Sequence, residues 1–222
     1  MMRFTCVKKP SRWLFTALVV ALVIGIGLRV WHLNSNPPTY PRVDHSMGED
    51  IELDGAFAEF AYENTDGYSI AVTNAKRMSP REYLDQYARG SSVPENPYDS
   101  TDEEAKVLVV LDIEIRNDKK SSEDRGYLDS IGWSLIPEEK KERWLRVDSS
   151  LFGLSVPQIE GAFQLSVKPG TEYTVHVPFS TSIYDEFPAS AGMGHKPLLD
   201  SGTYHFIVTN VPIRHVATID VP

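Results

Sequence analysis

The sequence predicts an all-β domain, built as a β-sandwich with one short helix, behind a single membrane-spanning helix. Three observations predict this arrangement. An uncharged apolar run follows a basic segment near the N-terminus, short segments of alternating apolar and polar residues recur between turn signals, and one segment carries the signals of a helix. Several short strands with little helix are typical of a sandwich.

The apolar run covers residues 13–28 and follows residues 1–12, which hold four basic side chains and no acidic one. A helix rises about 1.5 Å per residue, so crossing a hydrocarbon core about 30 Å thick takes roughly 20 residues. We therefore place the membrane helix at residues 13–33. Basic flanks stay in the cytoplasm, so the single-pass chain is expected to keep residues 1–12 inside and to carry its C-terminal domain outside the cell membrane.

A cleaved signal peptide is the alternative for this segment. Such a peptide needs small residues at its cleavage site, whereas Trp31, His32 and Leu33 follow the apolar run here. We therefore expect an uncleaved anchor, followed by a stalk at residues 34–43 that contains three prolines and no apolar periodicity. The extracytoplasmic domain is then expected at residues 44–222.

The segment 106–116, KVLVVLDIEIR, is the clearest strand because apolar and polar residues alternate along it. Its odd-numbered residues are apolar and are expected on the core face, while Asp112 and Glu114 point to solvent. Leu108 and Val110, on the second face, predict that the first half of the strand is covered on both sides. Further strands are expected at 51–53, 56–62, 68–75, 128–136, 143–147, 159–167, 172–178 (with Tyr173, Val175 and Val177 inward), 203–209 and 214–220.

One helix is expected from residue 80 to about residue 89. Ser79 is placed as its N-cap, Pro80 takes the first helical position, and Glu82 can reach back to the backbone N–H of the cap. This capping box satisfies N–H groups that have no partner inside a helix. The side chains expected to face the sheet are Tyr83, Leu84 and Tyr87.

Four stretches of the chain resemble a known family: Gly67-Tyr68-Ser69-Ile70, Pro80-Arg81-Glu82-Tyr83-Leu84, Val110-Leu111-Asp112-Ile113-Glu114-Ile115-Arg116-Asn117 and Lys168-Pro169-Gly170-Thr171-Glu172-Tyr173. The resemblance is to membrane-anchored proteins of Gram-positive and related bacteria, which are domains of unknown function. These proteins are similar to immunoglobulin-like extracytoplasmic lipoprotein domains. The resemblance implies an immunoglobulin-like β-sandwich outside the membrane over about residues 44–221, and it names no catalytic residue.

Charge and cysteine content narrow the functional classes. Residues 1–36 hold five basic side chains and no acidic one, so residues 37–222 hold 17 basic and 31 acidic side chains, a net charge of −14. Nucleic-acid binding is not expected, because no basic surface remains to displace counterions from phosphates. The single cysteine, Cys6, precedes the apolar run. The domain therefore has no disulfide, and burial of apolar side chains must hold its fold.

Motifs for catalysis and metal binding are weak. The chain has no G-x-S-x-G, no H-E-x-x-H and no cysteine in the domain for nucleophilic or zinc chemistry. His205 and His215 lie on predicted neighbouring strands, where they would approach one another if they bound a metal. The acidic loop 95–104 supplies carboxylates for calcium but lacks the alternation and central glycine of a calcium loop. We predict no cofactor and no metal.

The sequence therefore favours a non-enzymatic interaction module, an accessory or sensor protein with a protein partner in the cell envelope. Trp144, Tyr184 and His195 are the candidates for its interaction surface, because exposed aromatic rings make good contacts and His195 lies in a glycine-rich loop that can respond to pH. Trp133 is instead expected in the core. Two alternatives remain open: an envelope hydrolase or metal-dependent enzyme, and a purely structural surface protein.

Overall fold

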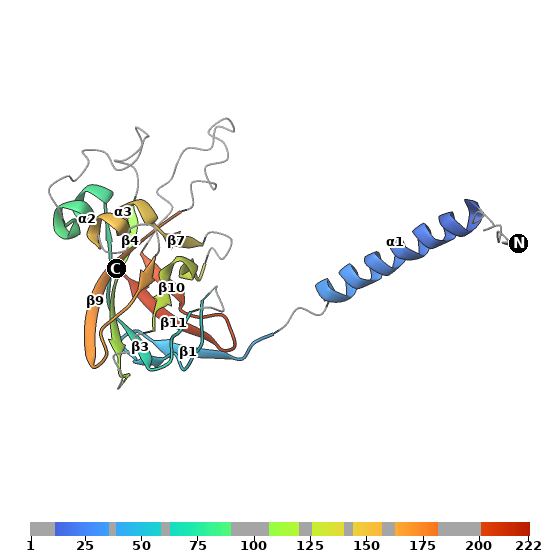
Figure 1. The fold of residues 1–222 in the computed structure, drawn as a ribbon. Helices are drawn as coiled ribbons and strands as arrows, with labels where there is room; N and C mark the ends of the chain where they lie inside the picture. The colour runs from blue at the N-terminus through green and yellow to red at the C-terminus, as the bar shows by residue number, and fades with distance from the viewer. Residues whose placement is uncertain are drawn as a thin grey trace, which may run out of the picture. The chain divides into compact units, whose positions relative to one another are not determined.

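The computed structural model describes residues 12–35, 39–58, 63–89, 107–119, 126–139, 144–156, 163–181 and 201–222. The chain divides into two compact units, Met1–Thr39 and Tyr40–Pro222. The first unit holds helix α1, Arg12–Ser35, whose segment Phe15–His32 is long and apolar enough to cross a membrane (Figure 1). A membrane anchor and a signal sequence both have these properties. Helix α1 contains the whole of the predicted span.

The second unit is built on a nine-stranded sheet with the strand order β1-β11-β10-β6-β7-β9-β4-β3-β2. Among the described strands, β1 and β11 pair in parallel and the other neighbours pair antiparallel. The strands are β1 Arg42–Ser46, β2 Ile51–Glu52, β3 Tyr68–Met78, β4 Leu108–Asn117, β6 Ser134–Pro137, β7 Leu145–Val147, β9 Thr171–Thr181, β10 Gly202–Ile207 and β11 Arg214–Val221. A separate two-stranded sheet pairs β5 Leu128–Asp129 with β8 Gln164–Leu165.

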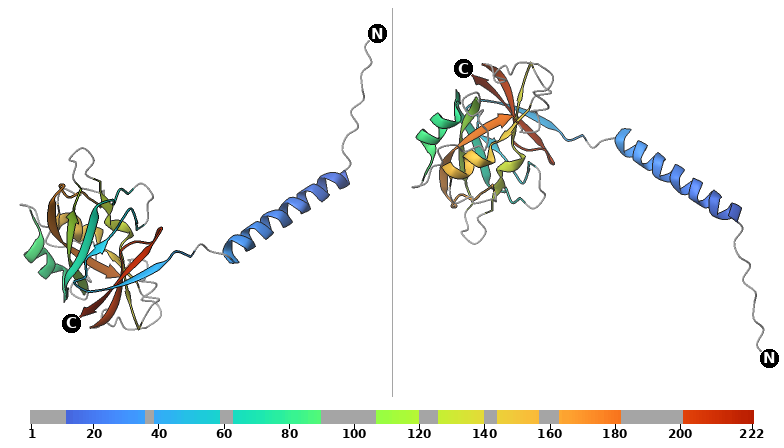
Figure 2. Two further views of the ribbon diagram at one scale, coloured as in Figure 1. Left: turned by 90° about the horizontal axis from the view of Figure 1, so that it is seen from below. Right: turned by 90° about the horizontal axis from the view of Figure 1, so that it is seen from above.

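The large sheet folds back on itself (Figures 1 and 2). Its two end strands, β1 and β2, are joined by a turn in which the N–H of Gly48 donates to the carbonyl of Val72 on β3, at 2.8 Å. Strand β3 also lies beside β11. The inward side chains of all the longer strands therefore enclose one apolar core. The prediction of a mostly β domain is confirmed.

Strands β3, β4 and β9 show why this sequence gives a two-faced sheet. The inward residues of β4 from Val109 to Ile115 are aliphatic and fully buried, as the alternation predicted. In β3 the register shifts between Val72 and Asn74, so Thr73 is a bulge. The bulge changes the inward set from even positions, ending at Val72, to odd positions, beginning at Ala75. As a result, the outward residues of β3 remain opposite the outward residues of β4 on both sides of the bulge.

Two short helices lie side by side against the outer face of this sheet (Figure 1). Helix α2, Pro80–Tyr87, begins with the predicted capping box of Ser79 and Glu82. Helix α3, Ser149–Ser155, was not predicted. Its N-cap is Asp148, whose carboxylate accepts from the N–H of Leu151. The helices share a second apolar cluster with β4 that comprises Tyr83, Leu84, Tyr87, Leu108, Val110 and Leu151. The predicted covering of the first half of β4 on both faces is confirmed.

Other predictions differ in detail. The segment 128–136 is not one strand, because a 3-10 turn, Ser130–Gly132, separates β5 from β6. Tyr173 was expected inward with Val175 and Val177 but is 49% exposed, because it lies near the end of β9. Strand β1, Arg42–Ser46, was not expected and begins inside the predicted stalk. Parts of the predicted strands 56–62 and 159–167 fall outside the described residues.

Replacement of Phe206 tests the core. Phe206 is fully buried and makes edge-on contacts with Trp133 and Phe179, at ring centroid distances of 5.5 and 5.8 Å. Phe206→Ala should lower the free energy of unfolding by about 3–5 kcal/mol, measured by urea unfolding of the full chain in detergent. Tyr173→Ala, at an exposed ring, is the control and should cost much less. Equal losses for the two variants would contradict the assigned core.

Candidate functional site

The outer face of β3, β4 and β9 changes from apolar to polar along its length. Helices α2 and α3 cover its apolar end at Leu108 and Val110. In the next row, Asn74, Asp112 and His176 lie opposite one another on the three strands. Titratable and hydrogen-bonding side chains therefore lie side by side at the point where helices α2 and α3 no longer cover the sheet.

Asp112 and His176 form a hydrogen-bonded pair in this row. Nδ1 of His176 lies 2.7 Å from one carboxylate oxygen of Asp112, and the side-chain amide of Asn74 donates to the other at 2.9 Å. Because a carboxylate only accepts, Nδ1 carries the proton in the neutral ring and Nε2 keeps its lone pair. The side chains of His176 and Asp112 are 31% and 15% exposed. An oriented, accessible imidazole of this kind can accept or deliver a proton.

Tyr87 and Lys76 complete the cluster. The Tyr87 ring stacks on the His176 ring with centroids 4.1 Å apart. The ammonium of Lys76 lies 4.9 Å from the centre of the Tyr87 ring and donates to its hydroxyl. Below them, the Tyr83 hydroxyl lies 2.7 Å from the carbonyl oxygen of His176 and 2.7 Å from Oγ of Ser155. Burial raises the pKa of Tyr83 well above its usual value, so Tyr83 stays neutral and acts as a structural bridge.

From the row of Asp112 onward the outward residues of the three strands are mostly polar, Ala71 of β3 being an exception, and we call seven of the polar ones the polar strip. Its members are Asn74, Asp112, Glu114, Arg116, Glu172, Thr174 and His176. They are exposed or half-exposed. Arg116, its cation, pairs with two further acids, Asp50 and Asp118. The strip and the acids bound to it therefore carry a net negative charge.

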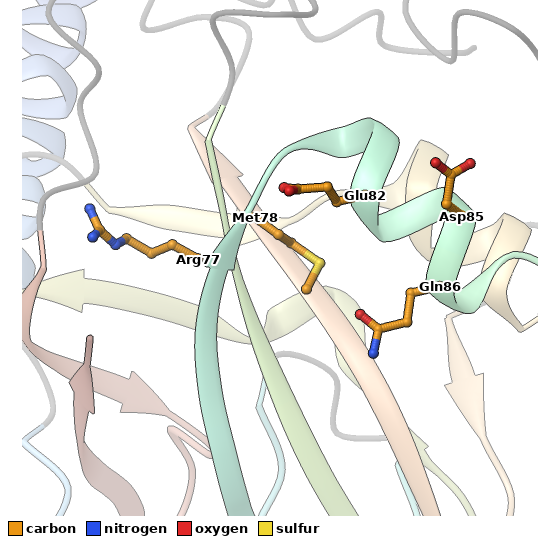
Figure 3. A pocket seen from close by; sticks show the side chains of 5 residues that line it. All are labelled: Arg77, Met78, Glu82, Asp85 and Gln86. Atoms are coloured by element: carbon orange, nitrogen blue, oxygen red, sulfur yellow. The ribbon is translucent and has the colours of Figure 1, made fainter.

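A separate hollow of about 470 Å³ lies between the end of β3 and the exposed side of α2 (Figure 3). It is lined by Arg77, Met78, Glu82, Asp85 and Gln86. Nε of Arg77 donates to the carbonyl of Pro222 at 2.7 Å, Glu82 serves the capping box, and Asp85 pairs with Arg81. Since structural contacts occupy these three charged groups, the hollow is a weak candidate for a binding site.

A second titratable cluster lies where β1 pairs with β11. Nε2 of His45 lies 2.9 Å from Nδ1 of His215, and Nδ1 of His45 lies 2.9 Å from Oε1 of Glu49. The pKa of His215 is lowered, mainly by burial and to a smaller extent by the nearby His45. The carboxylate of Asp54 acts in the opposite direction and partly offsets this lowering. The Ser46 N–H and then the His45 ring lower the pKa of Glu49. At neutral pH the cluster therefore has a neutral His215 and an ionised Glu49.

The structure describes some of the residues that the sequence singled out and not others. Trp144 is 44% exposed, and the guanidinium of Arg146 lies 4.5 Å from its ring centre. Tyr184 and His195 lie outside the described residues, as does the acidic loop 95–104. His205 is opposite Thr218 and so is not the partner of His215. Trp133 is in the core, as expected.

Sequence reasoning missed both clusters. His176 was assigned only to a predicted strand, yet Asp112 and His176 each occupy an outward position of a predicted strand, and that signal was available. His45 carried no such signal, because its strand has no alternation. Among the described residues, no three His, Cys, Asp or Glu side chains gather closely enough to hold a metal ion.

Comparison with known proteins agrees with the resemblance seen in the sequence. Residues 42–215 match a family described as a domain of unknown function, DUF5028. The chain belongs to this family. The expected membership in a family of unknown-function domains is thereby confirmed. The matched residues run from the start of β1 to the start of β11, and we call the unit that contains them the DUF5028 domain.

Two further comparisons add little. An uncharacterised β-sandwich protein from Clostridium difficile 630 is similar to the chain at 14% identity, with 83% of this chain and 100% of that chain covered and a TM-score of 0.36. No curated protein matches the chain.

The stability of the DUF5028 domain should fall on mild acidification. A lowered pKa of His215 means that the unfolded chain binds this proton more readily than the folded chain, so the stabilisation is complete above about pH 6.5 and is lost as the pH falls below it. Urea unfolding between about pH 7.5 and about pH 5 should show this slope in the native chain and a smaller slope in His215→Asn. Tyr173→Phe, an exposed control, should keep the native slope. An unchanged slope in His215→Asn would contradict the assignment.

Proposed function

We propose that the protein is a non-enzymatic interaction module, held outside the cytoplasmic membrane by α1 and binding a protein partner in the cell envelope through the polar strip. The observation that carries this proposal is the polar end of the β3–β4–β9 face. An ordinary two-layer domain covers a sheet face with apolar contacts or leaves it evenly solvated. Here half of one face is apolar and covered by helices, and the other half is polar with an excess of acids.

The proposed membrane anchor is supported by the length and apolar composition of α1 and by the basic residues that precede it. The helix is 24 residues long, and the charged residues among residues 1–11 before it are all basic. Both features favour a membrane helix with its N-terminus in the cytoplasm. Under this topology the acidic domain faces the outside of the cell, where its net charge of −14 for residues 37–222 favours partners that present basic residues.

An immunoglobulin-like fold is part of the proposal. Taken in sequence order, strands β3, β4, β6, β7, β9, β10 and β11 correspond to strands A, B, C, C′, E, F and G of a variable-type immunoglobulin domain. Two observations support this assignment: β3-β4-β9 and β11-β10-β6-β7 are each contiguous in the sheet, in the orders A-B-E and G-F-C-C′. Trp133 also fits, since it is buried immediately before β6 and packs on Phe206 of β10. The pairing of β7 with β9, which joins the two layers, departs from that fold.

An envelope hydrolase is the second candidate, and the Asp112–His176 pair favours it. A carboxylate that orients Nδ1 of a histidine leaves Nε2 available as a general base, and Tyr87 beside Lys76 adds a second proton-transfer group. Within the described residues no serine or cysteine hydrogen-bonds to the His176 ring. The pair therefore has the base of a hydrolytic site without an assigned nucleophile, and the interaction module has the stronger support.

Labelling of single cysteines tests the anchor and its orientation. In Thr174→Cys, the new thiol is outward on β9, and the natural Cys6, which precedes α1 in the sequence, serves as an internal control. A membrane-impermeant maleimide applied to intact cells should label Cys at position 174 and leave Cys6 unlabelled until the membrane is opened. A mature chain that lacks Cys6 would establish a cleaved signal, and labelling of Cys6 in intact cells would reverse the orientation.

Photocrosslinking from the polar strip tests the binding function. A photoreactive amino acid at Thr174 of the full chain should capture an envelope protein in intact cells. The double variant Glu114→Lys and Glu172→Lys should reduce that product by about tenfold or more, because charge reversal opposes a basic partner. Glu138→Lys with Glu139→Lys, two exposed positions just after β6, changes the net charge equally and should leave the product intact. Equal losses in both double variants, or no product, would count against the proposal.

A further inference from the structure

We propose that His45, His215 and Glu49 form a proton-controlled latch that holds β1 against β11 near neutral pH and releases β1 when the pair takes up a second proton. We call these three residues the histidine latch. It is separate from the polar strip, and it does not depend on the proposed binding function. It concerns how the start of the domain is attached to the rest.

Strand β1 has little else to hold it. Its backbone pairs with β11, with His45 opposite Ala217 and Val43 opposite His215. Every residue of β1 is exposed except His45, whose side chain is 9% exposed. His215 is 7% exposed. The contact between these two rings is therefore the principal buried side-chain contact of β1.

The hydrogen bonds of the latch determine how many protons it accepts. Glu49 can only accept, so Nδ1 of His45 carries a proton, and Nε2 of the neutral His45 accepts from the Nδ1–H of His215. One extra proton is tolerated, because either ring can be the cation while a single proton remains between the facing nitrogens. A second extra proton puts a hydrogen on both facing nitrogens. The hydrogen bond is then lost, and two cations repel each other at the same place.

The geometry of the pair is that of a shared proton and not of a metal site. The ring centroids lie 5.2 Å apart with 28° between the ring planes, while the facing nitrogens are 2.9 Å apart, so the rings meet edge to edge. Two nitrogens on one tetrahedral zinc ion, each about 2.0–2.1 Å from it, would be about 3.3 Å apart with their lone pairs converging on the ion. The observed contact is shorter and direct, as in a hydrogen bond.

The surrounding charges set the direction of the response. Asp54, after β2, favours the protonated form of His215, and Glu49 lies on the far side of His45. The other charged groups nearby are Arg42 paired with Asp44 on β1, Asp50 paired with Arg116, and Arg214 at the start of β11. Glu49 and Asp54 therefore permit the first proton, while burial and mutual repulsion oppose the second. Opening is expected on the acid side of an ordinary histidine.

Release of β1 has a mechanical consequence for the chain. Strand β1 is the first element of the domain, and only residues 36–41 separate it from α1. When β1 is paired, the tether to the helix ends at Arg42. When β1 is released, the tether extends to β2, which begins at Ile51 and remains paired with β3. Acidification would therefore lengthen the tether by about nine residues, which adds up to about 30 Å of reach.

Hydrogen exchange of the full chain in lipid nanodiscs tests the latch. After correction for the intrinsic pH dependence of exchange, the amides of residues 42–46 should lose protection by about tenfold or more between about pH 7.5 and about pH 5, while β4 keeps its protection. His215→Asn should abolish this loss, because the asparagine amide takes the place of Nδ1 as a donor and cannot be protonated. His176→Asn, remote from β1 in sequence and outside the latch, is the matched control and should retain the loss.

A second measurement keeps the test decisive if His215→Asn folds poorly. Ring-nitrogen NMR of the native full chain should show His45 and His215 titrating in two coupled steps, with the β1 amides changing only in the more acidic step. Two independent titrations, or β1 protection that is the same at both pH values, would overturn the latch. So would an acid loss of protection in His215→Asn equal to that of the native chain.

Discussion

Strand β4 must satisfy three environments at once, and the rest of the domain is arranged around that requirement. Its inward side chains lie in the core, the outward Leu108 and Val110 lie under the two helices, and the outward residues from Asp112 onward are polar. The bulge at Thr73 lets β3 keep the same order of surfaces beside it, since without it Ala75 would turn outward and Asn74 inward. The position of the Asp112–His176 pair follows directly from this, because the first polar row falls where the helical cover ends.

The two ends of the sheet are secured differently. At one end, β2 is short but begins with the fully buried Ile51 and continues a ladder that runs through β3 and β4. At the other, β1 contributes one partly buried side chain to the domain and depends on its pairing with β11. Local stability generally follows the amount of buried apolar contact. The strand nearest helix α1 in sequence is therefore the one least secured by the core.

The features that could be predicted from the sequence are those formed by residues close to one another along the chain. The capping box of α2 and the alternation of β4 are local patterns with one structural solution, and both were found. Helix α3 carried a usable signal in Asp148, an N-cap residue before Ser149, that was overlooked. The pairing of His45 with His215 carried none, because it joins residues 170 positions apart through a parallel ladder. A strand with a single partly buried side chain has no apolar alternation by which to be recognised.

Some acidic side chains of the domain make structural contacts, whereas others are available to a binding partner. Glu82 and Asp148 cap helices, Glu49 accepts from the Ser46 backbone and contacts His45, and Asp50 binds Arg116. Each of these carboxylates contributes to the fold, so its charge says little about a partner. Glu114 and Glu172 are different, because they stand outward on neighbouring strands beside an arginine that already contacts two other acids. A net charge of −14 for residues 37–222 by itself indicates only solubility, whereas acids left over after the structural contacts are made indicate where a basic partner would be attracted.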